Sequence, residues 1–321
     1  MLHTFTTFFS PFSAKMMYFC SLIIIAMSVK KLRFAIFGNI YQAKKSVSIQ
    51  KILSFLYERK AEVCIDSEFY TFLTDGLHID VKVDRVFEGD DFEADYVISM
   101  GGDGTFLKAA SRVGIKCIPI MGVNMGRLGF LADVGPSEIE HALLAVYAGQ
   151  YKIEEHVAIM VETQGVSQLA GCPFALNDIA VLKRDNASMI TIRTSINGEH
   201  LVNYQADGLI VSTPTGSTAY SLSNGGPIIA PQAGVLCLSP VAPHSLNVRP
   251  IVVPDDAVVR LCVESRNHNF LVAVDGRSEK CAEGTTLTIR KAPYPVKIIK
   301  RNTHKYFHTL REKMMWGADT R

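Results

Sequence analysis

The stretch Tyr96-Val-Ile-Ser-Met-Gly-Gly-Asp-Gly-Thr-Phe-Leu-Lys-Ala-Ala110 predicts a buried strand, a glycine turn and the start of a helix. The apolar run ends at Met100, and good helix formers follow from Thr105 onward. Glycines allow a tight turn whose backbone N–H groups face outward with no Cβ in the way. The helix that follows adds unpaired N–H groups and the positive end of its dipole. The turn therefore suits a phosphate group.

Asp103 is the unexpected member of this turn, because a carboxylate repels phosphates. An acid at this position must either accept a proton from a hydroxyl group or hold a bridging metal ion. Gly-Asp-Gly is also ordinary turn chemistry between a strand and a helix. These three residues alone leave the functional and the structural interpretation open.

Composition indicates an ordinary globular protein, with 48% hydrophobic and 20% charged residues. A length of 321 residues predicts about two domains. The formal net charge of +2 gives no indication of a nucleic-acid partner. The seven cysteines are scattered without a CxxC pair, which favours reduced thiols in the cytoplasm over a disulfide framework. No spacing typical of a zinc site is present, so we expect no metal-ligating residues.

Residues 1–28 need a separate interpretation. Met16 to Met27 is an apolar run about as long as the central region of a signal peptide, and it is too short for a comfortable membrane span. Export would conflict with the cysteine usage and with the need for a cytosolic phosphate donor. We therefore expect translation to start at Met27, residues 1–28 to lie outside the fold, and the protein to have no membrane partner.

The first half of the chain alternates strands and helices. We expect strands at residues 32–38, 62–66, 96–100 and 118–124, and helices at residues 46–60, 68–73 and 136–149. This order predicts a parallel sheet with ligands at the carboxyl ends of its strands. We assign residues 29–150 to a Rossmann-like α/β domain that binds phosphate and carries the catalytic turn.

The second half of the chain has a different sequence pattern, in which short β-rich runs are separated by turns. Asn197-Gly198 between two such runs is a strong signal for a hairpin. We expect a sandwich-like all-β domain at residues 151–292 that binds the nucleotide substrate. Residues 293–321 are expected to pack back on the N-terminal domain, with a helix over residues 300–316.

Two polar groups of residues interrupt the β-rich half. Asn177-Asp178 taken alone is more typical of a local turn than of a binding site. The stretch from Asp207 to Pro227 is different, since it is too apolar and too rich in glycine for a flexible linker. Its hydroxyl groups and its tyrosine suit a sugar, a phosphate or a flat ring. The hydroxyl side chains are those of Ser212, Thr213, Thr215, Ser217, Thr218, Tyr220, Ser221 and Ser223.

Taken in order, these motifs resemble those of the bacterial NAD kinases. The matching motifs are Gly101-Gly-Asp-Gly-Thr105, Asn124-x-Gly-x-Leu-Gly-Phe130, Asn177-Asp178, Asp207-Gly-Leu, Thr213-Pro-Thr-Gly-Ser-Thr-Ala-Tyr220, Gly225-Gly-Pro227 and Pro243 to Pro250. The resemblance covers roughly residues 31–290. The first motif alone is shared with diacylglycerol and sphingosine kinases, and the Thr213–Tyr220 run separates the NAD kinases from them.

The resemblance implies an enzyme of the NAD kinase/diacylglycerol kinase-like superfamily. Such an enzyme transfers the γ-phosphoryl group of ATP, carried with Mg²⁺ or another divalent cation, to the 2′-hydroxyl of the adenosine ribose of NAD. Asp103 matches the family's general base. The active site is expected in a cleft between the domains, and a neighbouring subunit of a homodimer or homotetramer is expected to contribute to it.

The resemblance also assigns binding roles. Gly101, Gly102, Gly104, Thr105 and Lys108 match the phosphate region, Asn177 and Asp178 the ribose hydroxyls, Asp207 the nicotinamide carboxamide, and Thr218, Ala219, Tyr220 and Ser223 the adenine and ribose side. Thr215, from the hydroxyl-rich run, is a further candidate for NAD binding. Ser188, Gln205 and Arg277 stand at NAD-contacting positions whose identity varies in the family. Asp178 replaces the commoner glutamate and is one methylene shorter, and Gln205 leaves the choice between NAD and NADH open.

Two alternatives remain at this stage. A lipid kinase of the same superfamily would need an apolar entrance for its substrate, and only residues 16–27 offer one. A non-catalytic sensor of NAD(H) or NADPH would keep the dinucleotide site, but the intact Asp103 argues against lost chemistry. Formation of NADP from NAD and ATP separates the kinase from both.

Overall fold

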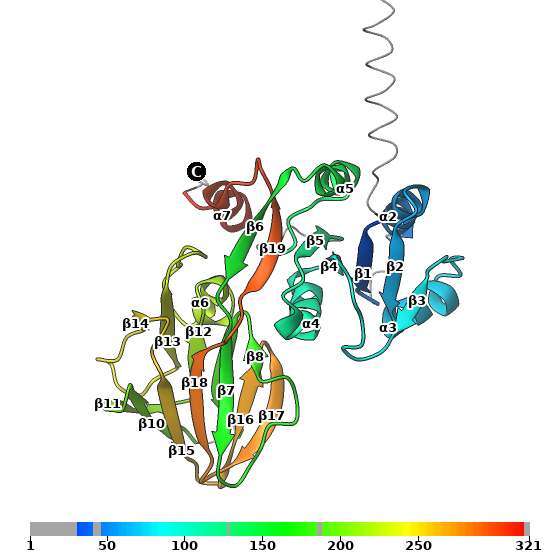
Figure 1. Ribbon diagram of the computed structural model, residues 1–321. Helices are drawn as coiled ribbons and strands as arrows, with labels where there is room; N and C mark the ends of the chain where they lie inside the picture. The colour runs from blue at the N-terminus through cyan, green and yellow to red at the C-terminus, as the bar shows by residue number, and fades with distance from the viewer. Residues whose placement is uncertain (1–30, 41–45, 127–128, 185–187, 318–321) are drawn as a thin grey trace, which may run out of the picture.

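The computed structural model describes residues 31–40, 46–126, 129–184 and 188–317 (Figure 1). The expected N-terminal extension, residues 1–28, lies outside these residues. Among the described residues, no helix is both long enough and apolar enough to cross a membrane.

A seven-stranded sheet forms the first half, with strand order β3-β2-β1-β4-β5-β19-β6. Its strands are β1 (Arg33–Gly38), β2 (Glu62–Asp66), β3 (Arg85–Phe87), β4 (Tyr96–Gly101), β5 (Ile120–Asn124), β6 (Tyr151–His156) and β19 (Val296–Arg301). The first five strands pair in parallel, which confirms the predicted parallel sheet. Strand β3 was not predicted from the sequence, because it has three residues and two of them are exposed.

Helices cover both faces of this sheet. The helical elements are α2 (Ser46–Glu58), α3 (Ser67–Thr71), the π-turn η2 (Phe72–Gly76), α4 (Asp103–Val113), the 3₁₀ turn η3 (Gly114–Lys116) and α5 (Ile139–Tyr147). Ile52 of α2 and Leu143 of α5 share one core with Phe34 of β1. Phe106 of α4 packs with Val97 of β4 in the core on the other face. The glycine turn therefore lies at the carboxyl edge of a helix-covered parallel sheet, as expected.

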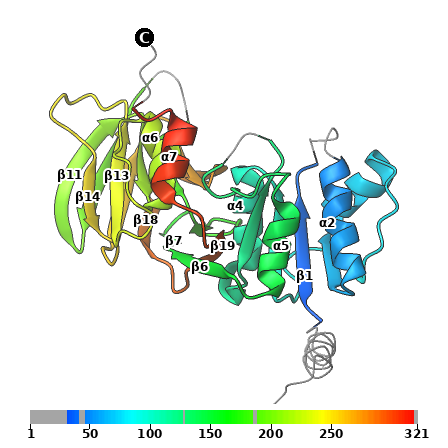
Figure 2. The ribbon, with the colours of Figure 1, turned by 90° about the horizontal axis from the view of Figure 1, so that it is seen from above.

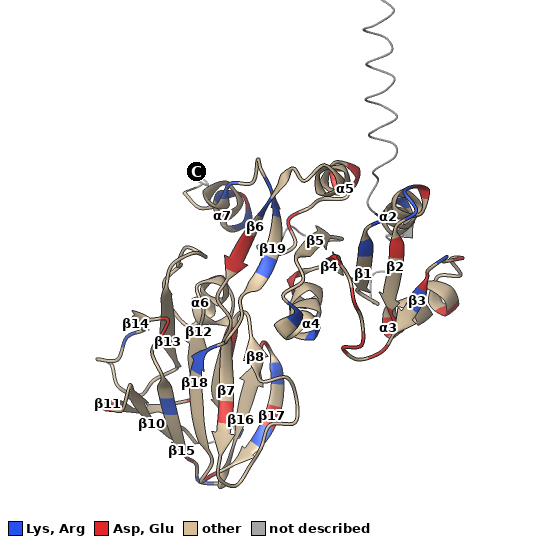
Figure 3. Ribbon diagram, in the orientation of Figure 1, with Lys and Arg blue, Asp and Glu red and all other residues tan. Residues whose placement is uncertain are grey.

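Strands β6 and β19 connect the two halves of the molecule. They pair in antiparallel fashion, and β19 also pairs in parallel with β5 through Ile298 and Ile120. Figure 3 shows the acidic β6 beside the basic β19, where Lys297 lies opposite Glu155. Both strands thus extend the first sheet, although the sequence analysis placed β6 at the start of the β-rich domain.

The predicted C-terminal helix is shorter than expected. Helix α7 spans Tyr306–Met314, because Lys300 and Arg301 still belong to strand β19. The helix lies over the junction of the two halves, beside β6 and β19 (Figures 1 and 2).

The second half is a sandwich of two six-stranded antiparallel sheets, as predicted. One sheet has the order β11-β10-β15-β18-β7-β8, and the other has the order β14-β13-β12-β9-β16-β17. The strands of the first are β7 (Ile159–Gln164), β8 (Phe174–Ala175), β10 (Ile190–Ile196), β11 (Glu199–Ala206), β15 (Val259–Glu264) and β18 (Thr286–Lys291). Those of the second are β9 (Asp178–Lys183), β12 (Gly208–Ser212), β13 (Val235–Val241), β14 (Ile251–Pro254), β16 (Asn269–Val274) and β17 (Arg277–Ala282). Leu261 and Val211 belong to the core that joins them.

The Asn197-Gly198 hairpin is confirmed. It joins β10 to β11, and the φ angles of 52° and 85° are both positive, as this tight turn requires.

Candidate functional site

The glycine turn joins β4 to α4 with Gly102 as the N-cap residue. A Cβ atom on Gly101 would collide with the side chain of Thr105, so glycine is needed there for packing. A Cβ atom on Gly102 or Gly104 would meet nothing within 4 Å. Open space therefore faces the turn at these two positions, and a phosphate can approach the backbone where the dipole of α4 is positive.

The carboxylate of Asp103 is held by a neighbouring loop. Its Oδ2 accepts a hydrogen bond from the backbone N–H of Phe130 at 3.0 Å. Its Oδ1 accepts from the N–H groups of Leu131 and Ala132, both at 3.1 Å. The ammonium of Lys313 lies 3.2 Å from Oδ2, and the Asp103 side chain is 30% exposed. The carboxylate is thus fixed in place while one side remains accessible.

The buried Lys300 holds the same loop, residues 130–132, through hydrogen bonds to its carbonyl groups. Lys300 has only 3% of its side chain exposed, and its Nζ lies 3.0 Å from the carboxylate of Asp133, which is 5% exposed. The same ammonium donates to the carbonyl oxygens of Phe130 and Leu131 at 3.4 Å. These two residues are among those that bind Asp103 through their N–H groups. Lys300, on β19, therefore helps to orient Asp103 through the backbone of Phe130 and Leu131.

A second carboxylate organises the loop that precedes β9. Asp275, in the turn after β16, accepts N–H hydrogen bonds from Leu176 and Asn177 at 2.8 Å and from Asp178 at 3.1 Å. The backbone N–H of Thr213 donates to the carbonyl of Asn177 at 2.9 Å. The Asn-Asp pair and the start of the hydroxyl-rich stretch are therefore joined in one hydrogen-bonded unit.

The two carboxyl groups of this unit influence each other. Burial, together with the neighbouring negative charge of Asp275, raises the pKa of Asp178 to about 7, against the opposing hydrogen bond from the backbone N–H of Tyr220. Burial also raises the pKa of Asp275, opposed by its three N–H donors. The pair resists carrying two negative charges, as adjacent carboxylates do.

The hydroxyl-rich stretch forms two short helical turns, η4 (Thr215–Thr218) and α6 (Tyr220–Ser223). Thr215 is buried and hydrogen-bonds the ring of His156 on β6 at 2.8 Å. Tyr220 has 40% of its surface exposed, and Ser223 is exposed as well. The ring that we expected to stack on a flat group is therefore accessible to a ligand.

These segments meet around the carboxyl edge of the first sheet. A small enclosed cavity is lined by Leu131 from the Asp103 loop and by Thr215 and Thr218 from η4. On the other side, Leu176, next to Asn177, lies in the same core as Phe106 of α4. The chain thus brings the glycine turn, the Asn-Asp pair and the residues of η4 and α6 into one site between the two halves.

Asp207 lies elsewhere. It precedes β12 and Thr213 follows that strand, so six residues at about 3.3 Å each place them about 20 Å apart. The pairing with β9 agrees, because Ser212 lies opposite Asp178 and Gly208 opposite Leu182. Asp207 forms an ion pair of 2.6 Å with Lys183, at the end of β9 away from Asp178.

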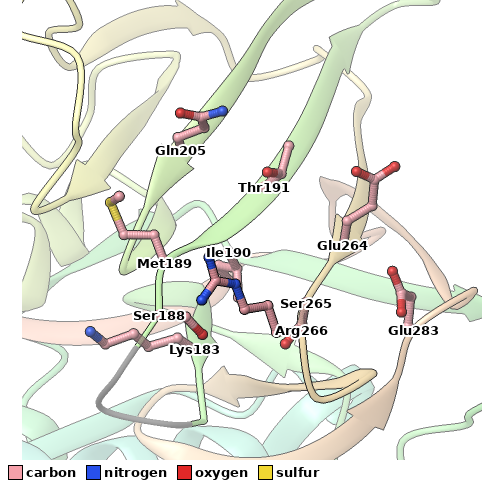
Figure 4. Close-up of a pocket in the computed structure, with 10 residues that line it drawn as sticks. All are labelled: Lys183, Ser188, Met189, Ile190, Thr191, Gln205, Glu264, Ser265, Arg266 and Glu283. Atoms are coloured by element: carbon pink, nitrogen blue, oxygen red, sulfur yellow. The ribbon is translucent and has the colours of Figure 1, made fainter.

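Ser188 and Gln205 are with Asp207 rather than with Asp103. Both line an open pocket on the sandwich that is surrounded by charged side chains of both signs (Figure 4). The charged residues are Lys183, Glu264, Arg266 and Glu283. The residues that the resemblance assigns to NAD therefore lie in two places on this chain.

Two further basic residues have partners within the chain. Lys108, expected at a phosphate, lies 3.3 Å from the carboxylate of Asp66 and 2.5 Å from that of Glu68. Arg277 is exposed and donates to the carbonyls of Val274 at 3.2 Å and Phe174 at 3.4 Å. Lys108 would have to exchange at least one of these acids for a phosphate in order to fill its predicted role.

Sequence reasoning missed three residues of this site. Asp275 stands before a glycine, as in an ordinary turn, so its sequence context does not mark it as a hydrogen-bond acceptor for another loop. Lys300 and Lys313 belong to a charged C-terminal segment. A cation in the last turn of a helix, where Lys313 stands, is ordinary. Within the described residues, no group of three or more His, Cys, Asp or Glu side chains could hold a metal ion.

Two family models match the chain. The ATP-NAD kinase N-terminal domain matches residues 34–151, and the ATP-NAD kinase C-terminal domain matches residues 176–301. An NAD kinase of Bacteroides fragilis is 58% identical over 290 residues, which cover 90% of this chain and 100% of that protein. An NAD kinase of Porphyromonas gingivalis is 42% identical over 289 residues, with 90% and 99% covered.

Solved structures give a consistent result. The yeast NADH kinase complexed with NADH has the same fold, with a TM-score of 0.81 at 19% identity over 90% of this chain and 89% of that one. An NAD kinase from Archaeoglobus fulgidus in complex with ATP has a TM-score of 0.69 at 28% identity, with 88% and 99% covered.

Proposed function

The chain belongs to the ATP-NAD kinase family and is an ATP-dependent NAD kinase; on this premise we propose that Asp103 is its general base. The observation that carries the proposal is the placement of the Asp103 carboxylate. Three backbone N–H groups hold it at the start of α4, beside the open space at Gly102 and Gly104. The base and the phosphate-binding turn are therefore adjacent, as phosphoryl transfer to a hydroxyl requires.

The reaction can be written around these groups. The 2′-oxygen of the adenosine ribose of NAD forms a bond to the γ-phosphorus of ATP. The bond from that phosphorus to the β,γ-bridging oxygen breaks, and ADP leaves with the electron pair. Asp103 accepts the proton of the hydroxyl group, and the product is NADP. The N–H groups of the glycine turn and the dipole of α4 stabilise the phosphate charge.

The ribose and the adenine are assigned to the hydrogen-bonded unit at one end of β9 and β12. This end, where Asp178 lies opposite Ser212, is called the near end, and the end with Lys183 and Asp207 is called the far end. Asn177 and Asp178 would bind the ribose hydroxyls, and Thr218, Ala219, Tyr220 and Ser223 the adenine side. Thr215, which is buried against His156, would support this surface from below. In the related solved structures, the yeast enzyme is complexed with NADH and the archaeal enzyme with ATP, which supports a site for both kinds of nucleotide.

Magnesium is proposed to arrive with ATP. The open space at the glycine turn and the adjacent carboxylate of Asp103 are compatible with a phosphate-bound cation. When bound, the ion would neutralise part of the phosphate charge.

A second subunit is proposed to complete the site. Asp207, Gln205 and Ser188 match NAD-contacting positions, but Asp207 lies about 20 Å along β12 from Thr213. This separation favours their reaching the dinucleotide from a neighbouring copy, which supports a homodimer or homotetramer. A cytoplasmic location is proposed because all six described cysteines are free thiols.

The test is a coupled assay with NAD, Mg-ATP and an NADP-specific dehydrogenase. Asp103→Asn should lower the turnover number by about 10²–10⁴-fold, the range of general-base catalysis, while NAD binding measured by calorimetry stays within about threefold. Asp91→Asn is the control, because Asp91 is exposed and pairs with Arg85 away from the turn. Turnover of Asp103→Asn within a few-fold of the wild type would remove the base assignment.

A further inference from the structure

We propose that Lys313 is a second catalytic residue, which contacts the transferring phosphoryl group; this proposal rests on the proposed position of Asp103 at the reacting hydroxyl. The Lys313 ammonium lies 3.2 Å from Oδ2 of Asp103 and 4.2 Å from the centroid of the Phe130 ring. Its side chain is 26% exposed. Among the described residues, Lys313 is the one basic side chain that forms an ion pair with Asp103.

Helix α7 is anchored so that Lys313 faces the site. Leu310 is buried and stands three residues before Lys313, on the same side of the helix. Thr309 and Tyr306 line the enclosed cavity together with Thr218 of the NAD-binding stretch. The helix therefore spans from the end of the first sheet to the proposed nucleotide site, and its last turn delivers a cation to Asp103.

The contact does more than hold the carboxylate. Asp103 already accepts three backbone hydrogen bonds, which fix both of its oxygens. A hydroxyl that donates to this carboxylate would lie about 3 Å from it, so the reacting oxygen comes within about 6 Å of the ammonium. A cation at this distance is well placed for the charge that develops on the phosphoryl oxygens in the transition state.

Other cations around the site are engaged elsewhere. Lys108 contacts Asp66 and Glu68, and Lys300 is buried beneath the Phe130–Leu131 loop against Asp133. Lys313, by contrast, pairs with Asp103 itself and keeps 26% of its side chain exposed.

The charge balance of the reaction explains why Lys313 would move its hydrogen bond from Asp103 to the phosphoryl group. When Asp103 accepts the hydroxyl proton it becomes neutral, and its attraction for the ammonium falls. The phosphoryl oxygens carry the negative charge at that stage. Lys313 keeps its own protons throughout and moves its hydrogen bond from Oδ2 to a γ-phosphoryl oxygen, while the P–O bonds form and break as described above.

The experiment compares Lys313→Met and Lys313→Arg with Arg311→Met, which removes an equal charge from an exposed position on the same helix. Lys313→Met should lower the turnover number by about 10²-fold, the effect of losing one transition-state donor, with the KM for NAD within about threefold. Lys313→Arg should recover at least about tenfold of that loss, since it restores a cationic donor. Arg311→Met should match the wild type. Turnover of a folded Lys313→Met within about threefold of the wild type would overturn the proposal.

The same substitution in the Asp103→Asn background separates contact from positioning. If Lys313 touches the phosphoryl group, Lys313→Met should slow the residual single-turnover rate of Asp103→Asn by about a further tenfold. If Lys313 only orients Asp103, this second effect is absent and the proposal is overturned. If Asp103→Asn alone keeps its turnover, the base assignment fails while the effect of Lys313→Met can still be read.

Discussion

The sheet that contains β9 and β12 has two ends of contrasting structure. At one end, Asp275 accepts three backbone hydrogen bonds, and Asp178 is only 5% exposed. At the other end, Lys183 and Asp207 form a partly exposed ion pair beside an open pocket that includes Gln205 (Figure 4). The near end is built entirely by one chain. The far end presents Gln205 and Asp207, which the family resemblance assigns to NAD.

The difference arises from what each end packs against. Leu176 and Phe174, which precede β9, join the core that contains Phe106 of α4, so the near end is covered by the first half of the molecule. The far end has Ser188 and Gln205 around an open pocket instead. The same pair of strands thus supplies a rigid surface at one end and an exposed surface at the other.

The largest effect is expected where burial is deepest. Lys300→Met would remove the ammonium from the buried carboxylate of Asp133 and leave the His304 ring, whose pKa burial lowers, at 3.4 Å, which should cost about 3–5 kcal/mol of the free energy of unfolding. Lys291→Met is the control, because its ion pair with Asp255 is half exposed on the lysine side and should contribute less than about 1 kcal/mol. Urea unfolding of the two variants measures both values. Equal losses would mean that the buried pair has no special role beside the site.

The two ends can be compared directly through one substitution at each. Asp275→Ala removes the acceptor of three N–H groups and should lower the free energy of unfolding by about 2–4 kcal/mol. Asp207→Ala removes one partly exposed ion pair and should cost about 1 kcal/mol or less. Thermal and urea unfolding give the comparison. A reversed order would contradict the view that the near end is the preformed one.

The pH dependence of NAD binding should also come from the near end. Because the pKa of Asp178 is raised to about 7, its ionised form is lost as the pH falls below neutrality. NAD affinity should then weaken by up to about tenfold per pH unit if only the carboxylate binds the ribose. The folded state should behave in the opposite way, losing stability as the pH rises from about 4 through about 7, since a raised pKa favours the protonated folded form. Asp178→Asn should flatten the binding profile and reduce the slope of the stability profile, to which Asp275 also contributes through its raised pKa. Unchanged profiles in this variant would assign the titration to another group.

Local features of the fold could be predicted from the sequence, because a few neighbouring residues determine them. The strand, glycine turn and helix from Tyr96 to Ala110 and the Asn197-Gly198 hairpin were found in this way. The membership of β19 in the first sheet could not be found, since its partners in β6 are far away in the chain.

In the site, too, local motifs could be predicted from the sequence, whereas contacts between distant parts of the chain could not. Asp103, Asn177 and Tyr220 could be selected from motifs, and the structure places their segments together. Lys313 meets Asp103 across 210 residues of sequence, and no spacing in the chain indicates that contact. The resemblance also gave no sign that Asp207 lies at the opposite end of β12, because the order of motifs along a chain does not say at which end of a strand each one lies.

A mixing experiment with NADP formation as the readout tests most directly whether the near end of one subunit and the far end of another form one site. Asp103→Asn and Asp207→Ala, each weak at an NAD concentration below the wild-type KM, are co-expressed with different tags and purified as mixed oligomers. If the near end of one subunit and the far end of another form one site, some sites in the mixture combine an intact Asp103 with an intact Asp207. Activity should then rise well above the sum of the two variants. Activity equal to that sum would show that each chain supplies its own complete site and would contradict the account.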